Sequence, residues 1–142
     1  MATYKTPFLQ LVSVAAIQDA GDCLTDEASI SSLPNSGTIM SCSLIDKGRQ
    51  SANTEVYLSQ KEFVGGAIDA LFSPSDAALL DMVGHIVLNT WFAFEDNSVC
   101  VVDNIGLPYY TPNGTLYLQL ITRGTPTPAS TSDYLISLGI VY

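Results

Sequence analysis

His85 and Cys100 are the side chains of this sequence best suited to nucleophilic chemistry, because an imidazole can act as a base and a thiolate as a nucleophile. His85 is the single histidine, and Asp81 precedes it by four residues, the spacing of a pair on one helix face. Catalysis would also need a cleft that joins His85 to Cys100, and no local motif links them. We therefore interpret His85 as a half-buried side chain at a helix end, and we expect that the protein is not an enzyme.

Four carboxylates gather in one glycine-containing segment, at Asp19, Asp22, Asp26 and Glu27. Hard cations such as calcium bind several loop oxygens, so a metal site is one interpretation. The spacing lacks the regular alternation of a calcium loop, and an acidic, solvated loop is the interpretation that we prefer. No glycine motif for a dinucleotide or a phosphate is present either. We predict neither a metal nor a cofactor.

The three cysteines, Cys23, Cys42 and Cys100, are odd in number and far apart, and no CxxC pair occurs. This pattern argues against both a disulfide framework and a zinc knuckle. Cys42 and Cys100 lie inside apolar runs that alternate as strands do. They are predicted to be buried free thiols.

Aromatic residues concentrate in the second half of the chain, at Trp91, Phe92, Phe94, Tyr109, Tyr110 and Tyr117. Such a group could form a carbohydrate platform or a protein contact. The acidic partners that accompany stacked sugar rings are not evident. We expect most of these rings to fill a core or a subunit seam.

The segments that must position these side chains show the two-residue period of β-strands. Near the C-terminus, alternate apolar residues fall on one side at Leu116, Leu118 and Leu120, and again at Tyr134, Ile136, Leu138 and Ile140. Further strands are predicted at 8–16, 38–46, 55–59, 86–94 and 99–102. In the strand at 38–46, Met40, Cys42 and Leu44 share one face. The prediction is an all-β chain of about seven to nine strands.

Turn and helix-cap residues separate these predicted strands. Ser73-Pro74-Ser75-Asp76 predicts the start of one short helix, which ends before Gly84. Residues 112–114 predict a hairpin turn. Residues 124–132 hold two prolines that stop strand pairing, so that the chain crosses to a new position. Residues 18–37 suit a long surface loop with one short strand, and residues 1–7 an N-terminal arm. The fold class predicted for 1–142 is a single-domain antiparallel β-sandwich or jelly roll.

The composition limits the classes of partner. The 142 residues are 47% hydrophobic and 13% charged, with a mean hydropathy of +0.28, so we expect an oligomer or a docked subunit. The alternative is an apolar core under a surface of Ser, Thr and Asn. A net charge of −9 disfavours nucleic acid. No apolar run is long enough to span a bilayer, and the first residues lack signal-peptide features, so synthesis in a cytosol is expected.

The run from Tyr117 to Thr127, which contains Arg-Gly-Thr-Pro-Thr, and the following Asp-led strand from Ser132 to Ile140 resemble the C-terminal signature of small virion proteins of tailed bacteriophages. The similarity extends upstream over 38–46, the strand near Val56, the helix at 75–80 and the connection at 104–109. Residues 18–37 have no counterpart in it. The resemblance implies a β-sandwich that cements or decorates the capsid shell, with no catalytic residues.

From this resemblance we expect the partners to be the major capsid protein and further copies of the chain, arranged as a trimer, in the virion after synthesis in the bacterial cytoplasm. The partner interface is predicted at Tyr109, Tyr110, Arg123, Pro126, Pro128 and Tyr142. The alternative is a tail or fibre component that recognises a host glycan or protein. That alternative predicts an exposed aromatic patch near Tyr109, Tyr110 and Trp91.

Overall fold

In the computed structural model, which describes residues 1–142, the chain forms eleven β-strands and one short α-helix. The turn-forming residues Gly, Pro, Asn and Asp recur between the apolar runs and keep most strands short. In chain order the elements are β1 (Thr3–Lys5), β2 (Leu9–Leu11), β3 (Ala28–Ile30), β4 (Ser36–Asp46), β5 (Thr54–Ser59), α1 (Asp76–Leu79), β6 (Met82–Leu88), β7 (Trp91–Ala93), β8 (Ser98–Val102), β9 (Leu107–Tyr110), β10 (Leu116–Thr122) and β11 (Tyr134–Val141).

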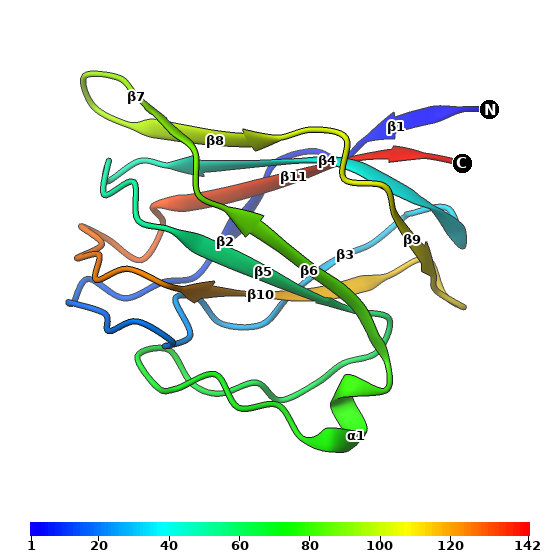
Figure 1. The fold of residues 1–142 in the computed structure, drawn as a ribbon, viewed down its shortest axis with the longest axis horizontal. Coiled ribbons are helices and arrows are strands. Elements are labelled where there is room, and N and C mark those ends of the chain that lie inside the picture. The colour runs from blue at the N-terminus through cyan, green and yellow to red at the C-terminus, as the bar shows by residue number, and fades with distance from the viewer.

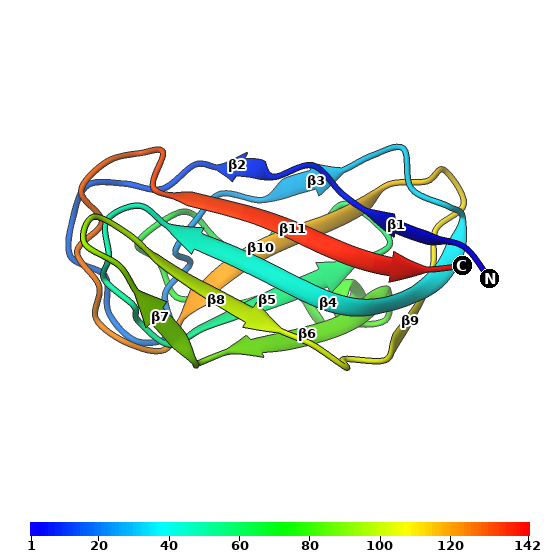
Figure 2. The same cartoon turned by 90° about the horizontal axis from the view of Figure 1, so that it is seen from above.

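The strands form two antiparallel sheets that pack face to face (Figure 1). The seven-stranded sheet has the order β1-β11-β4-β8-β7, with β2 also paired to β11 and β9 also paired to β4. The four-stranded sheet has the order β3-β10-β5-β6. The view from above shows the seven-stranded sheet lying across the other sheet (Figure 2). The prediction of an antiparallel β-sandwich with one short helix is confirmed.

The core lies between the sheets because each strand turns alternate side chains inward. The two-residue period of the C-terminal strands is confirmed, since all seven alternate residues are buried: Leu116, Leu118, Leu120, Tyr134, Ile136, Leu138 and Ile140. The thiols of Cys42 and Cys100 are free and lie in the same core, as predicted. The third cysteine, Cys23, is also free and buried.

Strand β4 departs from the predicted alternation at Met40. The register between β4 and β11 shifts there, so that Gly139 pairs with Ser41 and Ile140 pairs with Ile39. This β-bulge leaves Met40 without a partner on β11 and turns Ile39 into the core. The prediction that Met40 shares the core face is therefore wrong.

The N-terminal residues are part of the seven-stranded sheet and do not form a free arm. Strand β1 pairs with the end of β11, and β2 pairs with its beginning. The predicted strand at 8–16 is consequently only three residues long. The backbone N–H and C=O groups of β1 and β2 form hydrogen bonds with the edge of β11. In a projecting arm these groups would be left to solvent.

Residues 18–37 are also more deeply buried than a surface loop. Gln18, Cys23, Leu24 and Thr25 are buried, and β3 pairs with β10. The backbone N–H of Leu24 donates to the carbonyl oxygen of Leu120 at 2.9 Å. The prediction of one short strand here is confirmed, whereas that of a surface loop is wrong for the buried part.

The turn at 112–114 joins two sheets and does not form a hairpin. Strand β9 pairs with β4 in the seven-stranded sheet, while β10 pairs with β3 and β5 in the four-stranded sheet. The turn residues therefore reverse the chain without pairing the strands that flank them. The loop at 124–132 makes the predicted crossing, from β10 back to β11.

Helix α1 is a single turn. The hydroxyl of Ser75 caps it by accepting a hydrogen bond from the backbone N–H of Ala78 at 3.1 Å. The chain leaves the helix at Leu80 and enters β6 at Met82, so His85 lies within a strand. The predicted helical pair of Asp81 and His85 is therefore wrong, and the Asp81 carboxylate lies 3.6 Å from Lys61 Nζ.

Residues 60–81, which we call the cover, pack against the outer face of the four-stranded sheet (Figure 1). Phe63 and Phe72 of the cover flank Tyr57 of β5, with ring centroids 4.8 and 5.2 Å from that of Tyr57. Tyr57, Phe63 and Ile121 form a second, smaller apolar cluster there. No segment of the chain crosses the outer face of the seven-stranded sheet (Figure 2).

Candidate interaction surface

The two residues best suited to nucleophilic chemistry lie in different layers of the sandwich. Cys100 in β8 faces the core, and burial raises the pKa of its thiol, which keeps the thiol protonated at neutral pH. His85 in β6 pairs with Tyr57, whose ring lies on the outer face of the four-stranded sheet. The structure does not bring the thiol and the imidazole together.

His85 instead lies beside an ion pair between Glu55 and Arg123. The guanidinium Nε of Arg123 donates to Glu55 Oε2, and His85 Nε2 lies 3.9 Å from Glu55 Oε1. These residues border a small hollow of about 190 Å³ whose wall includes Tyr57 and Ile121. Sequence reasoning missed this cluster, because only the pairing of β5 with β6 and β10 places the three side chains side by side.

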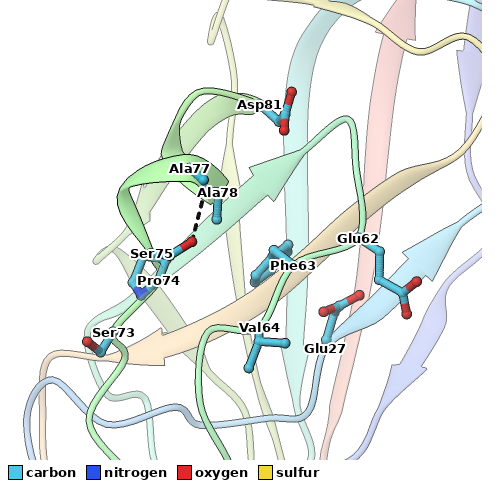
Figure 3. A pocket seen from close by; sticks show the side chains of 10 residues that line it. All are labelled: Glu27, Glu62, Phe63, Val64, Ser73, Pro74, Ser75, Ala77, Ala78 and Asp81. Atoms are coloured by element: carbon cyan, nitrogen blue, oxygen red, sulfur yellow. Dashed lines mark hydrogen bonds between the residues drawn. The ribbon is translucent and has the colours of Figure 1, made fainter.

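The acidic segment contributes one residue to a second, wider hollow of about 940 Å³ beside the cover (Figure 3). Glu27 and Glu62 lie on one side of this hollow, with Phe63 and Val64 between them and helix α1. Burial raises the pKa of Glu27, and the charge of Glu62 raises it further, against a hydrogen bond from the Phe63 backbone. The hollow is therefore acidic, with an apolar floor.

Asp19, Asp22 and Asp26 do not join Glu27 in a metal site. The backbone N–H of Asp19 donates to Asp22 Oδ2 at 3.1 Å, as in a solvated turn. No group of three or more His, Cys, Asp or Glu side chains in residues 1–142 is arranged to hold a metal ion. We assign the segment to loop structure and to the rim of the acidic hollow.

Two buried carboxylates hold loops at one end of the sandwich. The Asp46 carboxylate accepts hydrogen bonds from the backbone N–H groups of Gly48, Gln50 and Ser51 at 2.8–3.1 Å. Asp133 accepts from the backbone of Ala129 at 2.8 Å and from the Ser130 hydroxyl at 2.7 Å. Burial raises the pKa of Asp46, and the charge of Asp133 adds to this effect. Because donors from the same chain satisfy these oxygens, their role is structural.

The six residues predicted for a partner interface divide into two groups. Tyr110, Arg123 and Tyr142 are exposed, and they can contact a partner. Tyr109, Pro126 and Pro128 are buried, and the Tyr109 hydroxyl donates to the carbonyl oxygen of Pro34 at 3.0 Å. The interface prediction must therefore be restricted to the exposed three, because a side chain packed inside the fold has no surface to offer.

Tyr109 and Trp91 do not form an aromatic patch. Tyr109 pairs with Gly37, whereas Trp91 lies in the row of Cys100 and Leu44. Seven residues along β4 separate the two rows, a distance of roughly 23 Å. The indole N–H of Trp91 also donates to the carbonyl oxygen of Ala52 at 3.0 Å. The aromatic platform expected of a fibre component is absent at this place.

An apolar row crosses four strands on the outer face of the seven-stranded sheet. Leu135 pairs with Ile45, Ile45 with Val99, and Val99 with Phe92. Directly paired residues point to the same side of a sheet, and the residues next to these four in each strand face the core. Val101 lies two residues along β8 from Val99, on the same face, where it pairs with Ser43. We call the following set the apolar patch: Ile45, Phe92, Val99, Val101 and Leu135.

The outer face that carries the apolar patch has no carboxylate. The strands of the seven-stranded sheet contain only two charged residues, Lys5 and Asp46. Asp46 is 1% exposed and pairs with Tyr134, which is also buried. All the other carboxylates of this strongly acidic chain lie outside these strands.

A second exposed apolar surface lies on the opposite side of the molecule, on the cover. Val64 and Leu80 are 84% and 86% exposed, and Leu71 is also exposed. Val64 lines the acidic hollow together with Glu27 and Glu62. The molecule thus presents one apolar surface without carboxylates and one with them.

No model of a protein family matches this chain, and no curated protein matches it in sequence. Among solved structures it is similar to the crystal structure of the serine protease of Aeromonas sobria in complex with its chaperone, with a TM-score of 0.40 and 11% identity over 100% of this chain and 28% of that chain. It is also similar to the native virion of Kashmir bee virus at neutral pH, with a TM-score of 0.26 and 10% identity over 98% of this chain and 69% of that chain.

This chain thus spans less than a third of the first of these two chains. At such TM-scores neither alignment assigns a function to this chain. No helix of the structure has the length and apolar character needed to cross a membrane.

Proposed function

We propose that this chain is a structural protein of a bacteriophage virion, which binds the assembled capsid shell as a cement or decoration subunit. Its partner is then the major capsid protein, and its place is the capsid surface after synthesis in the bacterial cytoplasm. The resemblance of the chain from about Thr38 to its end to small virion proteins of tailed bacteriophages motivates this proposal. A subunit that binds only the assembled shell stabilises that shell by mass action and needs no catalytic group.

The observation that carries the proposal is the exposed apolar surface of the cover beside an acidic hollow. Large apolar side chains that an otherwise well-packed domain leaves exposed can mark a contact surface. The carboxylates of Glu27 and Glu62 add charge complementarity toward Lys or Arg side chains of the shell. Val64 is an exposed apolar residue of the cover and also lines the acidic hollow, so it is the residue to test.

The first experiment counts this chain in purified phage particles by quantitative mass spectrometry against the major capsid protein. About one copy per shell subunit is the result expected of a cement protein that occupies a repeated lattice position. A handful of copies per particle would favour a tail or fibre component. Complete absence from particles would overturn the proposal.

The second experiment asks whether the cover is the docking surface. Val64→Asp adds a fourth carboxylate to the hollow, beside Glu27, Glu62 and Asp81, and it should weaken binding to particles that lack the native subunit. Val87→Asp is the matched control, because Val87 in β6 is also an exposed valine and lies outside the cover. Equal binding of the two variants would remove the cover from the proposal.

A further inference from the structure

The apolar patch departs from the usual pattern of an antiparallel sheet. Such a sheet normally buries one face in the core and turns polar side chains outward on the other. Here four paired positions in a row are apolar on the outward face, from Leu135 through Ile45 and Val99 to Phe92. Phe92 is 62% exposed and Val101 is 45% exposed. The pattern is that of a sheet with a second partner layer.

The four-stranded sheet shows what such a partner layer does in this molecule. Its outward residues Tyr57 and Ile121 are apolar too, and they are buried beneath Phe63 and Phe72 of the cover. The seven-stranded sheet also turns apolar side chains outward, but no segment of the chain lies over its outer face (Figure 2). A layer that covers the apolar patch must therefore come from another molecule.

We propose that a second copy of this chain covers the apolar patch, through a two-fold, face-to-face contact between two seven-stranded sheets. A two-fold contact uses the same surface on both copies. Each copy has a net charge of −9, so two copies repel each other wherever carboxylates meet. The outer face of the seven-stranded sheet has no carboxylate, and it lets two copies approach with their acidic surfaces turned away.

The size of the face agrees with a weak dimer contact. The strands β11, β4, β8 and β7 have eight, eleven, five and three residues, which at about 3.3 Å per residue and about 4.8 Å between strands give roughly 430 Å² per copy. Two copies would bury roughly 860 Å² in total, which is the size of a weak, transient contact. The contact is therefore expected to be reversible at micromolar concentrations.

Small side chains beside the patch permit two sheets to pack closely. Ser41, Ser43 and Gly139 lie next to it along β4 and β11, and Lys5 and Gln10 of the edge strands β1 and β2 lie on the same face, paired with Gly139 and Leu135. Face-to-face sheets pack about 10 Å apart, so the contact centres on β4 and β8 and leaves Lys5 and Gln10 at its rim. The proposed unit is a two-fold pair, whereas the resemblance to virion proteins implies a trimer. The inference rests on the sheet alone and does not depend on the proposed capsid role.

The test is the oligomeric state of the purified chain, measured by sedimentation velocity over concentrations from about 1 to 100 µM. The wild-type chain should form dimers. Val101→Asp places two carboxylates in the contact and should raise the dissociation constant by about 100-fold. Phe92→Asp, on another strand, should act in the same way. Val87→Asp, at a valine that is 47% exposed on β6 of the other sheet, should leave the dimer unchanged.

A wild-type chain that stays monomeric throughout this range would overturn the inference. Dimers of unchanged affinity in both Val101→Asp and Phe92→Asp would also overturn it, because another surface would then make the contact. If the chain is monomeric and Val101→Asp instead abolishes binding to phage particles, the patch contacts the shell, which refutes self-association and leaves the capsid proposal standing. Dimers that depend on the patch, in a chain absent from particles, would refute only the capsid proposal.

Discussion

The two outer faces of the sandwich are built from the same strand pattern but are completed differently. On the four-stranded sheet the outward ring of Tyr57 packs between Phe63 and Phe72 of the cover. On the seven-stranded sheet the outward side chain of Phe92 is largely exposed. Apolar side chains on the first face therefore stabilise the fold of one chain. Those on the second face remain free to stabilise an association.

The difference shows why strand periodicity alone does not reveal what an outward apolar residue does. Ile121 and Val99 both lie on outward positions of strands, and both follow the two-residue period. Only the segment that returns over the sheet distinguishes them. The cover is a stretch of residues between β5 and β6 without long regular structure, and it buries Ile121 by sending Phe63 back over the strand.

The largest expected effect separates two phenylalanines. Phe63→Ala should lower the free energy of unfolding by about 3 kcal/mol, because it removes a buried ring and leaves a cavity under the cover. Phe92→Ala should change that free energy by about 0.5 kcal/mol or less, because its ring is already in solvent. Urea unfolding of both variants at one dilute protein concentration measures the difference. Similar losses in the two variants would show that the faces do not differ as described.

A smaller effect is expected from two glycines, one under each outer face. A Cβ on Gly65 would overlap the ring of Phe72, which packs against Tyr57. It would also lie near the Gln119 side-chain oxygen, and the amide nitrogen of Gln119 is fixed by hydrogen bonds to Thr25 and Gly66. Gly65→Ala should therefore cost about 2 kcal/mol of unfolding free energy.

Gly139→Ala is the matched substitution on the outer face of the seven-stranded sheet, which no segment covers and which we call the bare face. Its Cβ would meet the hydroxyl of Ser41, and the next nearest atom is the Ser41 Cβ at 3.5 Å. Rotation of one hydroxyl relieves this contact, so the cost should stay below about 0.5 kcal/mol. Thermal unfolding of the two variants compares them directly. A larger loss for Gly139→Ala would mean that the bare face is as tightly packed as the covered one.

The sequence was sufficient to predict the elements whose alternation faces the core. Leu116, Leu118 and Leu120 were placed correctly because the hydrophobic effect acts on them in any pairing of β10. The helix start within Ser73–Asp76 is confirmed because capping is local, but the cap is Ser75, so Pro74 precedes the helix and is not its first residue. Local chemistry sets both features.

The errors occurred where partners distant in the sequence decide the outcome. The turn at 112–114 was predicted as a hairpin, yet β9 pairs with β4 across a sequence separation that no turn rule describes. The spacing of Asp81 and His85 predicts a half-buried histidine at a helix end, whereas pairing of β6 with β5 places His85 in a strand with its side chain exposed. The apolar patch could not be predicted for the same reason, because its residues come from four strands whose order in the sheet is not evident from the sequence.

The smallest expected effect concerns the charge that the covered side carries and the bare face lacks. Burial, together with the charge of Glu62, raises the pKa of Glu27, so folding favours the protonated form of this carboxyl. Its contribution to stability is therefore fully present below the unfolded pKa of about 4.3, and it is lost as the pH rises through the folded value. At pH 7 the ionised side chain destabilises the fold slightly.

Glu27→Gln should accordingly raise the free energy of unfolding at pH 7 by about 0.5 kcal/mol or less, since solvent screens a half-exposed group. At a pH of about 3 both side chains are neutral, and the difference should disappear. Glu95→Gln, at the exposed turn between β7 and β8, removes the same charge without the burial and should have a smaller effect. Equal gains from the two substitutions would assign the effect to net charge, and a loss of stability in Glu27→Gln would mean that the ionised carboxylate is needed to hold the cover in place.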